Sequence, residues 1–121
     1  MQSRQERGYS LDILFRDRSF EDECNDFRQL KKHQGELRAK KIRQRLDDLR
    51  AAEVLEDMKT LPGRCHELKG NRSNQLSLDL DHPWRLIFTP ADDPPACKPD
   101  GGIDWNGIRA VEIIGIEDTH E

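Results

Sequence analysis

Histidine and arginine are residue types that could move a proton or hold a phosphate, and the sequence offers His66, His120 and Arg85 among them. His66 and His120 could both give and take protons, because the unperturbed pKa of histidine, about 6.5, lies near neutral pH. Arg85 carries a planar guanidinium that can hold a phosphate by two parallel hydrogen bonds. Plainer explanations exist for the histidines: a penultimate residue is commonly part of a frayed tail, and His66 could be a half-buried strand residue. Their roles depend on the elements that position them.

A two-residue alternation places Arg85 on one face of an expected β-hairpin. Residues 75–81 have leucine at every second position, and residues 84–89 repeat the pattern with larger apolar side chains. Such a period is typical of strands that bury one face. Arg85 then projects onto the opposite face, where it could bind a phosphate. The alternative is an exposed strand arginine that pairs with Asp79 across the hairpin.

The amino-terminal half has one strand pattern followed by helical patterns. Residues 11–15 alternate with a period of two and predict a first strand. A short helix is predicted over residues 20–32, with Phe27 and Leu30 on its buried side. Its start falls at Ser19–Asp22, where a hydroxyl and acidic side chains suit the first turn of a helix.

A second helix is predicted from Glu36 to Arg50, because apolar residues recur there at intervals of three and four. The basic residues of this segment fall on the other side, which is typical of a solvated helix face. These residues are Arg38, Lys41 and Arg45. Residues 54–58 predict another turn or two of helix, and Leu61-Pro62-Gly63 ends the helical half.

The carboxyl-terminal half is predicted to be mostly strand. Residues 64–69 are a short strand candidate, and residues 70–74 form a turn by composition. Residues 90–107 predict a long loop, because they contain prolines and glycines without periodicity. The β-branched run 108–116 predicts a strand buried on both faces. The whole order predicts an α+β fold with an amino-terminal strand and two helices packed on one face of a mostly antiparallel β-sheet, whose other face is open for a ligand.

Length and charge limit the class of protein. The 121 residues suit one domain, residues 11–121, preceded by a flexible arm at residues 1–10. The net charge of −4 and the pI near 5.6 weigh against a nucleic-acid binder, because polyanions favour basic surfaces. Bases are nevertheless concentrated over residues 28–45 and 64–72, which is compatible with a local basic face.

Three widely spaced cysteines indicate reduced thiols in a cytosolic protein. A zinc site through Cys65, His66, Cys97 and His120 would lack the paired spacing of structural sites, so neither a metal nor another cofactor is expected. No apolar run approaches the ~20 residues that span a bilayer, and no signal peptide is recognised. The protein is therefore expected to be cytoplasmic.

Three segments stand in an order known from one protein family. They are HELKG at residues 66–70, the strands QLSLDL and WRLIF at residues 75–80 and 84–88, and VEII with DTH at residues 111–114 and 118–120. They resemble the LKG segment, the W-S-I and W-R-I-x-F strands and the terminal D-Y-H of the HigB branch of the RelE/ParE toxin superfamily. The resemblance covers residues 11–120 except the long loop, and it implies a RelE-like fold.

The resemblance implies the toxin of a type II toxin–antitoxin system, a ribosome-dependent mRNA endonuclease that inhibits translation. Such toxins need no metal: the ribose 2′-hydroxyl attacks the adjacent phosphorus and leaves a cyclic phosphate and a free 5′-hydroxyl. His120 is then the first catalytic candidate and His66 its proton partner. Arg85 would stabilise the phosphate, and Asp118 would orient His120 or act as the base.

The same resemblance implies partners and binding residues. Lys69 and Arg72 would hold the backbone of mRNA or ribosomal RNA. The expected partners are a HigA-like helix-turn-helix antitoxin, the ribosome and mRNA, with operator DNA bound only through the antitoxin and no membrane.

Two departures keep other functions open. Leu76 and Thr119 stand where the family has tryptophan and tyrosine. Threonine cannot stack on a base, whereas stacking by an aromatic side chain is worth ~1–3 kcal/mol per base. The enzyme could therefore be slower, differently selective or inactive. A ParE-like toxin that acts on DNA gyrase and a non-catalytic interaction module on the same fold are the competing functions.

Overall fold

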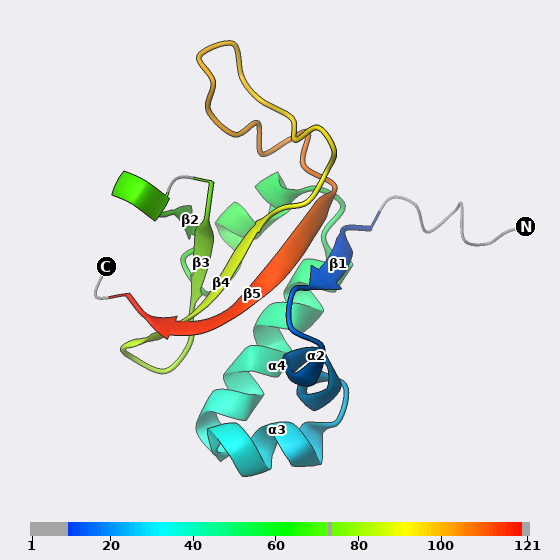
Figure 1. Cartoon of the computed structure of the whole chain (residues 1–121), viewed down its shortest axis with the longest axis vertical. Helices are drawn as coiled ribbons and strands as arrows, with labels where there is room; N and C mark the ends of the chain where they lie inside the picture. Colours follow the sequence, from blue (N-terminus) through cyan, green and yellow to red (C-terminus); the bar gives the residue numbers. More distant parts are fainter. Residues whose placement is uncertain (1–9, 73, 120–121) are drawn as a thin grey trace, which may run out of the picture.

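The computed structural model describes residues 10–72 and 74–119 (Figure 1). Residues 1–9, most of the expected amino-terminal arm, lie outside this range, as does His120. The elements follow one another as β1 (Asp12–Phe15), α2 (Arg18–Cys24), α3 (Phe27–Gln34), α4 (Glu36–Ala51), the 3-10 helix η2 (Leu55–Thr60), β2 (His66–Glu67), the 3-10 helix η3 (Gly70–Arg72), β3 (Leu76–Asp79), β4 (Trp84–Pro90) and β5 (Ala110–Asp118).

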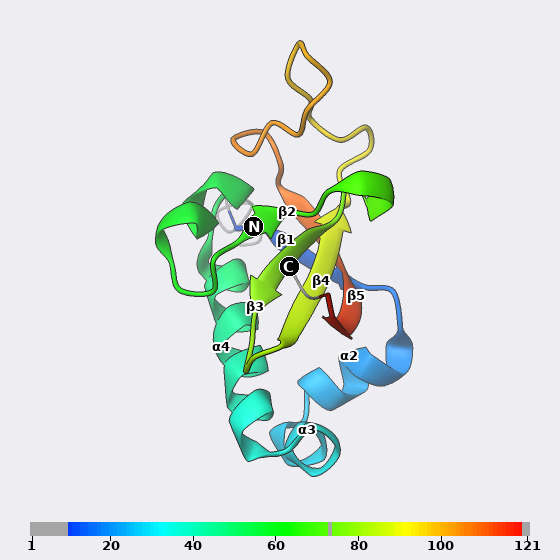
Figure 2. The same cartoon turned by 90° about the vertical axis from the view of Figure 1, so that its left-hand side faces the viewer.

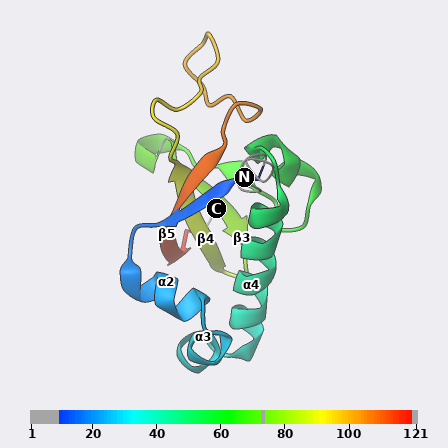
Figure 3. The same ribbon diagram turned by 90° about the vertical axis from the view of Figure 1, so that its right-hand side faces the viewer.

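The strands of the described residues form one five-stranded sheet in the order β1-β5-β4-β3-β2. β1 pairs in parallel with β5, and the other neighbours pair antiparallel. Helix α4 runs along one face of the sheet, with α2 and α3 gathered at one end of the molecule (Figures 1 and 3). The α+β prediction, with helices on one face of a mostly antiparallel sheet, is confirmed.

The first predicted helix, residues 20–32, is in fact two helices. Asn25 and Asp26 separate them, and the Asp26 carboxylate caps α3 by accepting a hydrogen bond from the Arg28 N–H. A cap of this kind starts a new helix because it satisfies an otherwise unpaired backbone donor. The predicted start at Ser19 is also wrong, since the cap of α2 is Asp17, whose carboxylate accepts from the N–H groups of Ser19 and Phe20.

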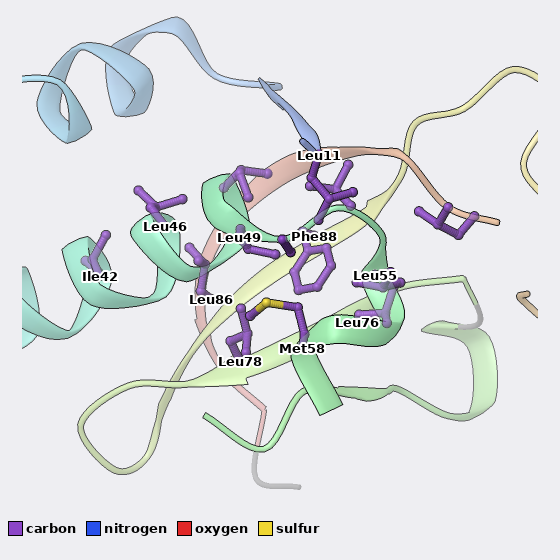
Figure 4. Packing of buried hydrophobic residues seen from close by; sticks show 14 of the residues in the cluster. Leu11, Ile42, Leu46, Leu49, Leu55, Met58, Leu76, Leu78, Leu86 and Phe88 are labelled. Carbon is purple, nitrogen blue, oxygen red and sulfur yellow. The ribbon is translucent and has the colours of Figure 1, made fainter. Parts of the chain in front are cut away.

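Helix α4 supplies the helical side of the core (Figure 4). Its apolar residues recur at intervals of three and four and are fully buried against β3, β4 and η2, as predicted: Ala39, Ile42, Leu46 and Leu49. Arg45 does not belong to a solvated face, because it is 6% exposed and its Nε donates to the Asp79 carbonyl at 2.8 Å. Position 45 lies beside the apolar stripe, and its long side chain reaches under the end of β3.

Strand β5 contains a bulge, and the bulge decides which side chains share a face. Phe88 of β4 pairs with Ile113, whereas its neighbour Ile87 pairs with Gly115, so Ile114 is an extra residue in β5. An inserted residue reverses the alternation of everything after it. The prediction that this strand is buried on both faces is wrong, since its residues alternate between buried and half-buried up to the bulge.

The carboxyl-terminal connections differ in extent from the predicted ones. The strand expected at residues 64–69 is limited to β2, and the expected turn at residues 70–74 begins with η3. The predicted loop is present between β4 and β5 and extends away from the sheet (Figures 1 and 2). It is anchored by Trp105, which is buried and donates from Nε1 to the Glu67 carboxylate at 2.8 Å.

The predicted break at Leu61-Pro62-Gly63 has a definite structural cause. Gly63 has a φ of +111°, a conformation that side chains disfavour. A Cβ at this position would lie 2.8 Å from Arg45 Nε and 3.0 Å from the Leu78 side chain.

No helix of the described residues is long and apolar enough to cross a membrane.

We expect Gly63→Ala to lower the free energy of unfolding by more than the ~1–3 kcal/mol of backbone strain alone. Gly35→Ala is the matched control, because Gly35 also has a positive φ but a Cβ there would meet nothing within 4 Å. Urea unfolding of both variants measures the difference. Equal destabilisation would show that the contact with Arg45 imposes no constraint.

Candidate functional site

The sheet face opposite α4 carries most of the residues that the sequence singled out. The strand register arranges them in two neighbouring rows across this surface, which we call the polar face. One row contains His66, Ser77, Ile87 and Gly115, and the next contains Asp79, Arg85 and Glu117. No helix of the described residues passes in front of β3 and β4 on this side (Figure 2).

Arg85 lies at the floor of the polar face. It is 5% exposed, its Nε forms an ion pair with Asp79 Oδ1 at 2.9 Å, and its Nη1 donates to Thr119 Oγ1 at 3.2 Å. The alternative that Arg85 pairs with Asp79 across the hairpin is therefore confirmed, but the expected exposure of the arginine is wrong. A buried guanidinium needs such partners because an unpaired buried charge is costly.

Asp79 is bound through its carboxylate and through both of its backbone polar groups. The sequence did not identify it as a site residue. Arg64 Nε contacts its second carboxylate oxygen, Oδ2, at 3.1 Å. Its backbone N–H donates to the Gly63 carbonyl at 2.7 Å, and its own carbonyl accepts from Arg45. The alternation of residues 75–81 already placed Asp79 on the same face as Arg85, and this was the available signal.

Arg72 lies across the polar face. Its Nε and Nη2 donate to Gln75 Oε1 at 3.0 and 2.8 Å, while Nη1 pairs with Glu117 Oε1 at 2.8 Å. Gln75 and Glu117 lie on either side of the row that contains Ser77 and Ile87, so the Arg72 guanidinium passes over that row. Ser77 and Ile87 of the polar face are completely buried.

His66 is half-buried at the edge strand, as the plainer explanation predicted. Its Nδ1 lies 2.8 Å from the Arg64 carbonyl oxygen. Because a carbonyl can only accept, Nδ1 is the donor of this hydrogen bond. Arg64 presents this carbonyl from a left-handed backbone with a φ of +52°, which is unusual for a residue other than glycine.

The remaining candidates are not all brought together. Asp118 pairs with Trp84, whose ring packs against the core, so the bulge in β5 turns Asp118 to the side opposite Arg85. Lys69 is exposed in the connection between β2 and η3. His120 lies outside the described residues, although its neighbour Thr119 reaches Arg85.

The fold is similar to two solved structures. The YoeB–YefM complex from Staphylococcus aureus aligns with a TM-score of 0.53 and 20% identity, over 88% of this chain and 94% of that one. The YoeB dimer from the same organism aligns with a TM-score of 0.50 and 22% identity, over 87% and 92%. The fold is YoeB-like. No protein-family model and no curated protein sequence matches this chain, so the likeness concerns the fold alone.

The thiols do not assemble into a metal site within the described part of the chain. Residues 10–72 and 74–119 contain no cluster of three His, Cys, Asp or Glu side chains that could hold a metal ion. Burial raises the pKa of Cys24 and of Cys65 to about 12, whereas Cys97 is exposed in the long loop. The raised pKa values leave both half-buried thiols protonated at neutral pH, and a protonated thiol is a poor nucleophile.

We therefore expect a disulfide reagent at pH 8 to modify Cys97 rapidly and the other two cysteines only after unfolding in urea. The thiols can be counted by absorbance in the folded and unfolded protein. Cys97→Ser, the control, should abolish the rapid phase. Three equally reactive thiols in the folded protein would contradict the burial of Cys24 and Cys65.

Proposed function

We propose that this chain is the toxin of a type II toxin–antitoxin system and that it cleaves mRNA on the ribosome. The observation that carries the proposal is the gathering of His66, Arg72 and Arg85 on one sheet face free of covering helices. The YoeB-like fold and the ordered motifs at residues 66–70, 84–88 and 118–120 support it. We place the chain in the HigB branch on the motifs.

The proposed reaction is attack of the ribose 2′-hydroxyl on the adjacent phosphorus. His66 accepts the 2′ proton at Nε2 while the new oxygen–phosphorus bond forms. The bond to the 5′-oxygen breaks, and His120 donates a proton to that oxygen. Arg85 binds the phosphate through Nη1 once the hydrogen bond from Nη1 to Thr119 Oγ1 is broken, and it stabilises the charge that develops on the phosphate. The products are a 2′,3′-cyclic phosphate and a free 5′-hydroxyl, without a metal.

The binding residues and partners follow from the same proposal. Arg72 and the exposed Lys69 hold the RNA backbone beside the reacting phosphate. Asp118 lies on the other side of β5, so its place in the proposal is to orient His120 from behind the strand. An antitoxin partner is proposed by analogy with a fold neighbour solved as the YoeB–YefM complex. Its HigA-like helix-turn-helix type follows from the motif resemblance alone.

A second function is favoured by one observation. Arg85 is 5% exposed and is bound to both Asp79 and Thr119, which suits a structural arginine in a non-catalytic interaction module. Thr119 in place of the family tyrosine points the same way. The two functions differ in whether removal of the guanidinium abolishes an activity or only affects folding.

We expect expression of the chain alone to arrest growth and to create new 5′ ends within translated mRNA. Arg85→Ala should lower cleavage by about 10²–10³-fold and His66→Ala or His120→Ala by about 10²–10⁴-fold. Mapping of mRNA 5′ ends after induction measures the effect. The matched control is Arg38→Ala, because Arg38 also pairs with an aspartate, Asp81, away from the polar face.

Three results would contradict the proposed function. Growth arrest with intact mRNA and DNA damage would replace the proposal with a gyrase-directed toxin. Soluble protein without any arrest would exclude both toxin functions and leave the interaction module. Cleavage that survives Arg85→Ala and His66→Ala would show that the polar face is not the active site.

A further inference from the structure

The orientation of Arg85 is fixed by a chain of polar contacts that starts outside the proposed active site. A guanidinium offers two edges to an anion, one formed by Nε and one Nη nitrogen and the other by the two Nη nitrogens. In this protein Asp79 Oδ1 occupies Nε at 2.9 Å, while Nη1 points to Thr119. The edge directed towards the end of β5 is therefore the one formed by Nη1 and Nη2.

Arg64 fixes the carboxylate that makes this choice. Arg64 Nε donates to Asp79 Oδ2 at 3.1 Å and its Nη2 donates to Oδ1 at 3.4 Å, the oxygen that also contacts Arg85 Nε at 2.9 Å. The backbone of Asp79 cannot shift to follow a moving side chain, because its N–H and C=O groups are bound to Gly63 and Arg45. Asp79 is thus held rigidly before any ligand arrives.

We propose that Arg64 and Asp79 are positioning residues that turn the Nη1–Nη2 edge of Arg85 towards the RNA phosphate. The inference rests on the proposed endonuclease function and adds to it two residues that do not touch the substrate. A positioned guanidinium loses little freedom when it binds, and a displacement of about 1 Å can cost about 10²-fold in rate. Arg64 has a second role in the same device, because its carbonyl accepts a hydrogen bond from His66 Nδ1.

An opposing role for Asp79 is conceivable on electrostatic grounds. A carboxylate beside Arg85 could compete with phosphate for the guanidinium, in which case its removal would strengthen binding. The contact geometry favours positioning, because Asp79 engages Nε and leaves the other edge directed towards Thr119. The two roles predict opposite changes in KM.

The first test observes Arg85 directly and needs no enzyme activity. In a nitrogen-15 NMR spectrum at neutral pH, the Nε–H signal of Arg85 should shift and exchange faster with water in Asp79→Ala. The signal of Arg45 should persist there, because its acceptor is the backbone carbonyl of residue 79. Asp81→Ala is the matched control: it should release the Nε–H of Arg38 and leave that of Arg85 unchanged. An unaltered Arg85 signal in Asp79→Ala would overturn the proposal.

The second test separates positioning from competition in the cleavage reaction on programmed ribosomes. Asp79→Ala should lower kcat by about 10–10²-fold with little change in KM. Asp79→Asn keeps an oxygen acceptor for Arg85 Nε and should recover part of the loss. Arg64→Asn, which tolerates the left-handed backbone, should lower kcat less than Asp79→Ala.

A lower KM with unchanged kcat in Asp79→Ala would overturn positioning in favour of competition. If Asp81→Ala lowered kcat as much as Asp79→Ala does, any broken aspartate–arginine pair would have this effect. That result would also overturn the positioning role of Asp79. If the unaltered protein cleaves no RNA, the proposed function fails, while the NMR result still decides whether Arg64 and Asp79 orient Arg85.

Discussion

The ion pair between Asp79 and Arg85 is the constraint on which the rest of the polar face depends. The guanidinium lies at the floor of the sheet with 5% exposure, where an unpaired charge is unstable, so the carboxylate must be present and correctly placed. Its placement in turn requires Arg64 on the second oxygen and Arg45 on the backbone carbonyl. Gly63 belongs to the same arrangement because a Cβ there would lie 2.8 Å from Arg45 Nε. Arg45 of α4, Gly63 and Asp79 of β3 therefore all contribute to the position of Arg85.

This constraint also relates the acidic composition to the proposed RNA substrate. The net charge of −4 weighs against binding a polyanion, yet the three arginines Arg64, Arg72 and Arg85 share only two carboxylates. Asp79 pairs with Arg64 and Arg85, and Glu117 pairs with Arg72. Close opposite charges of this kind act locally, whereas net charge describes the field at a distance. The local arrangement of guanidinium groups, and not the average charge, governs contact with a phosphate.

The sequence predicted the parts of the fold that depend on local periodicity. The alternation in residues 75–81 and 84–89 placed Asp79 and Arg85 on one face, and the structure bears this out. The apolar stripe of α4 was equally legible. Two features could not be predicted in this way. The burial of Arg45 depends on the space beneath the end of β3, which the sequence of α4 does not describe.

The second feature is the bulge at Ile114. Continued alternation from Val111 would put Asp118 on the face of Arg85, and the extra residue puts Glu117 and Thr119 there instead. Bulges arise from the pairing of two strands, so one strand's sequence does not reveal them. Shared fold does not decide chemistry either, since one fold supports several functions and likeness to YoeB at 20–22% identity extends to the fold alone.

In the proposed mechanism, Asp79 acts on RNA cleavage through Arg85. A double-mutant cycle on the cleavage rate, with Asp79→Ala, Arg85→Lys and the double variant, measures this coupling most directly. If Asp79 serves to orient the guanidinium, its removal should matter little once lysine has replaced the arginine, and the double variant should be about as slow as Arg85→Lys alone. Losses that multiply independently would contradict the claim, because Asp79 would then act by a route that does not pass through Arg85.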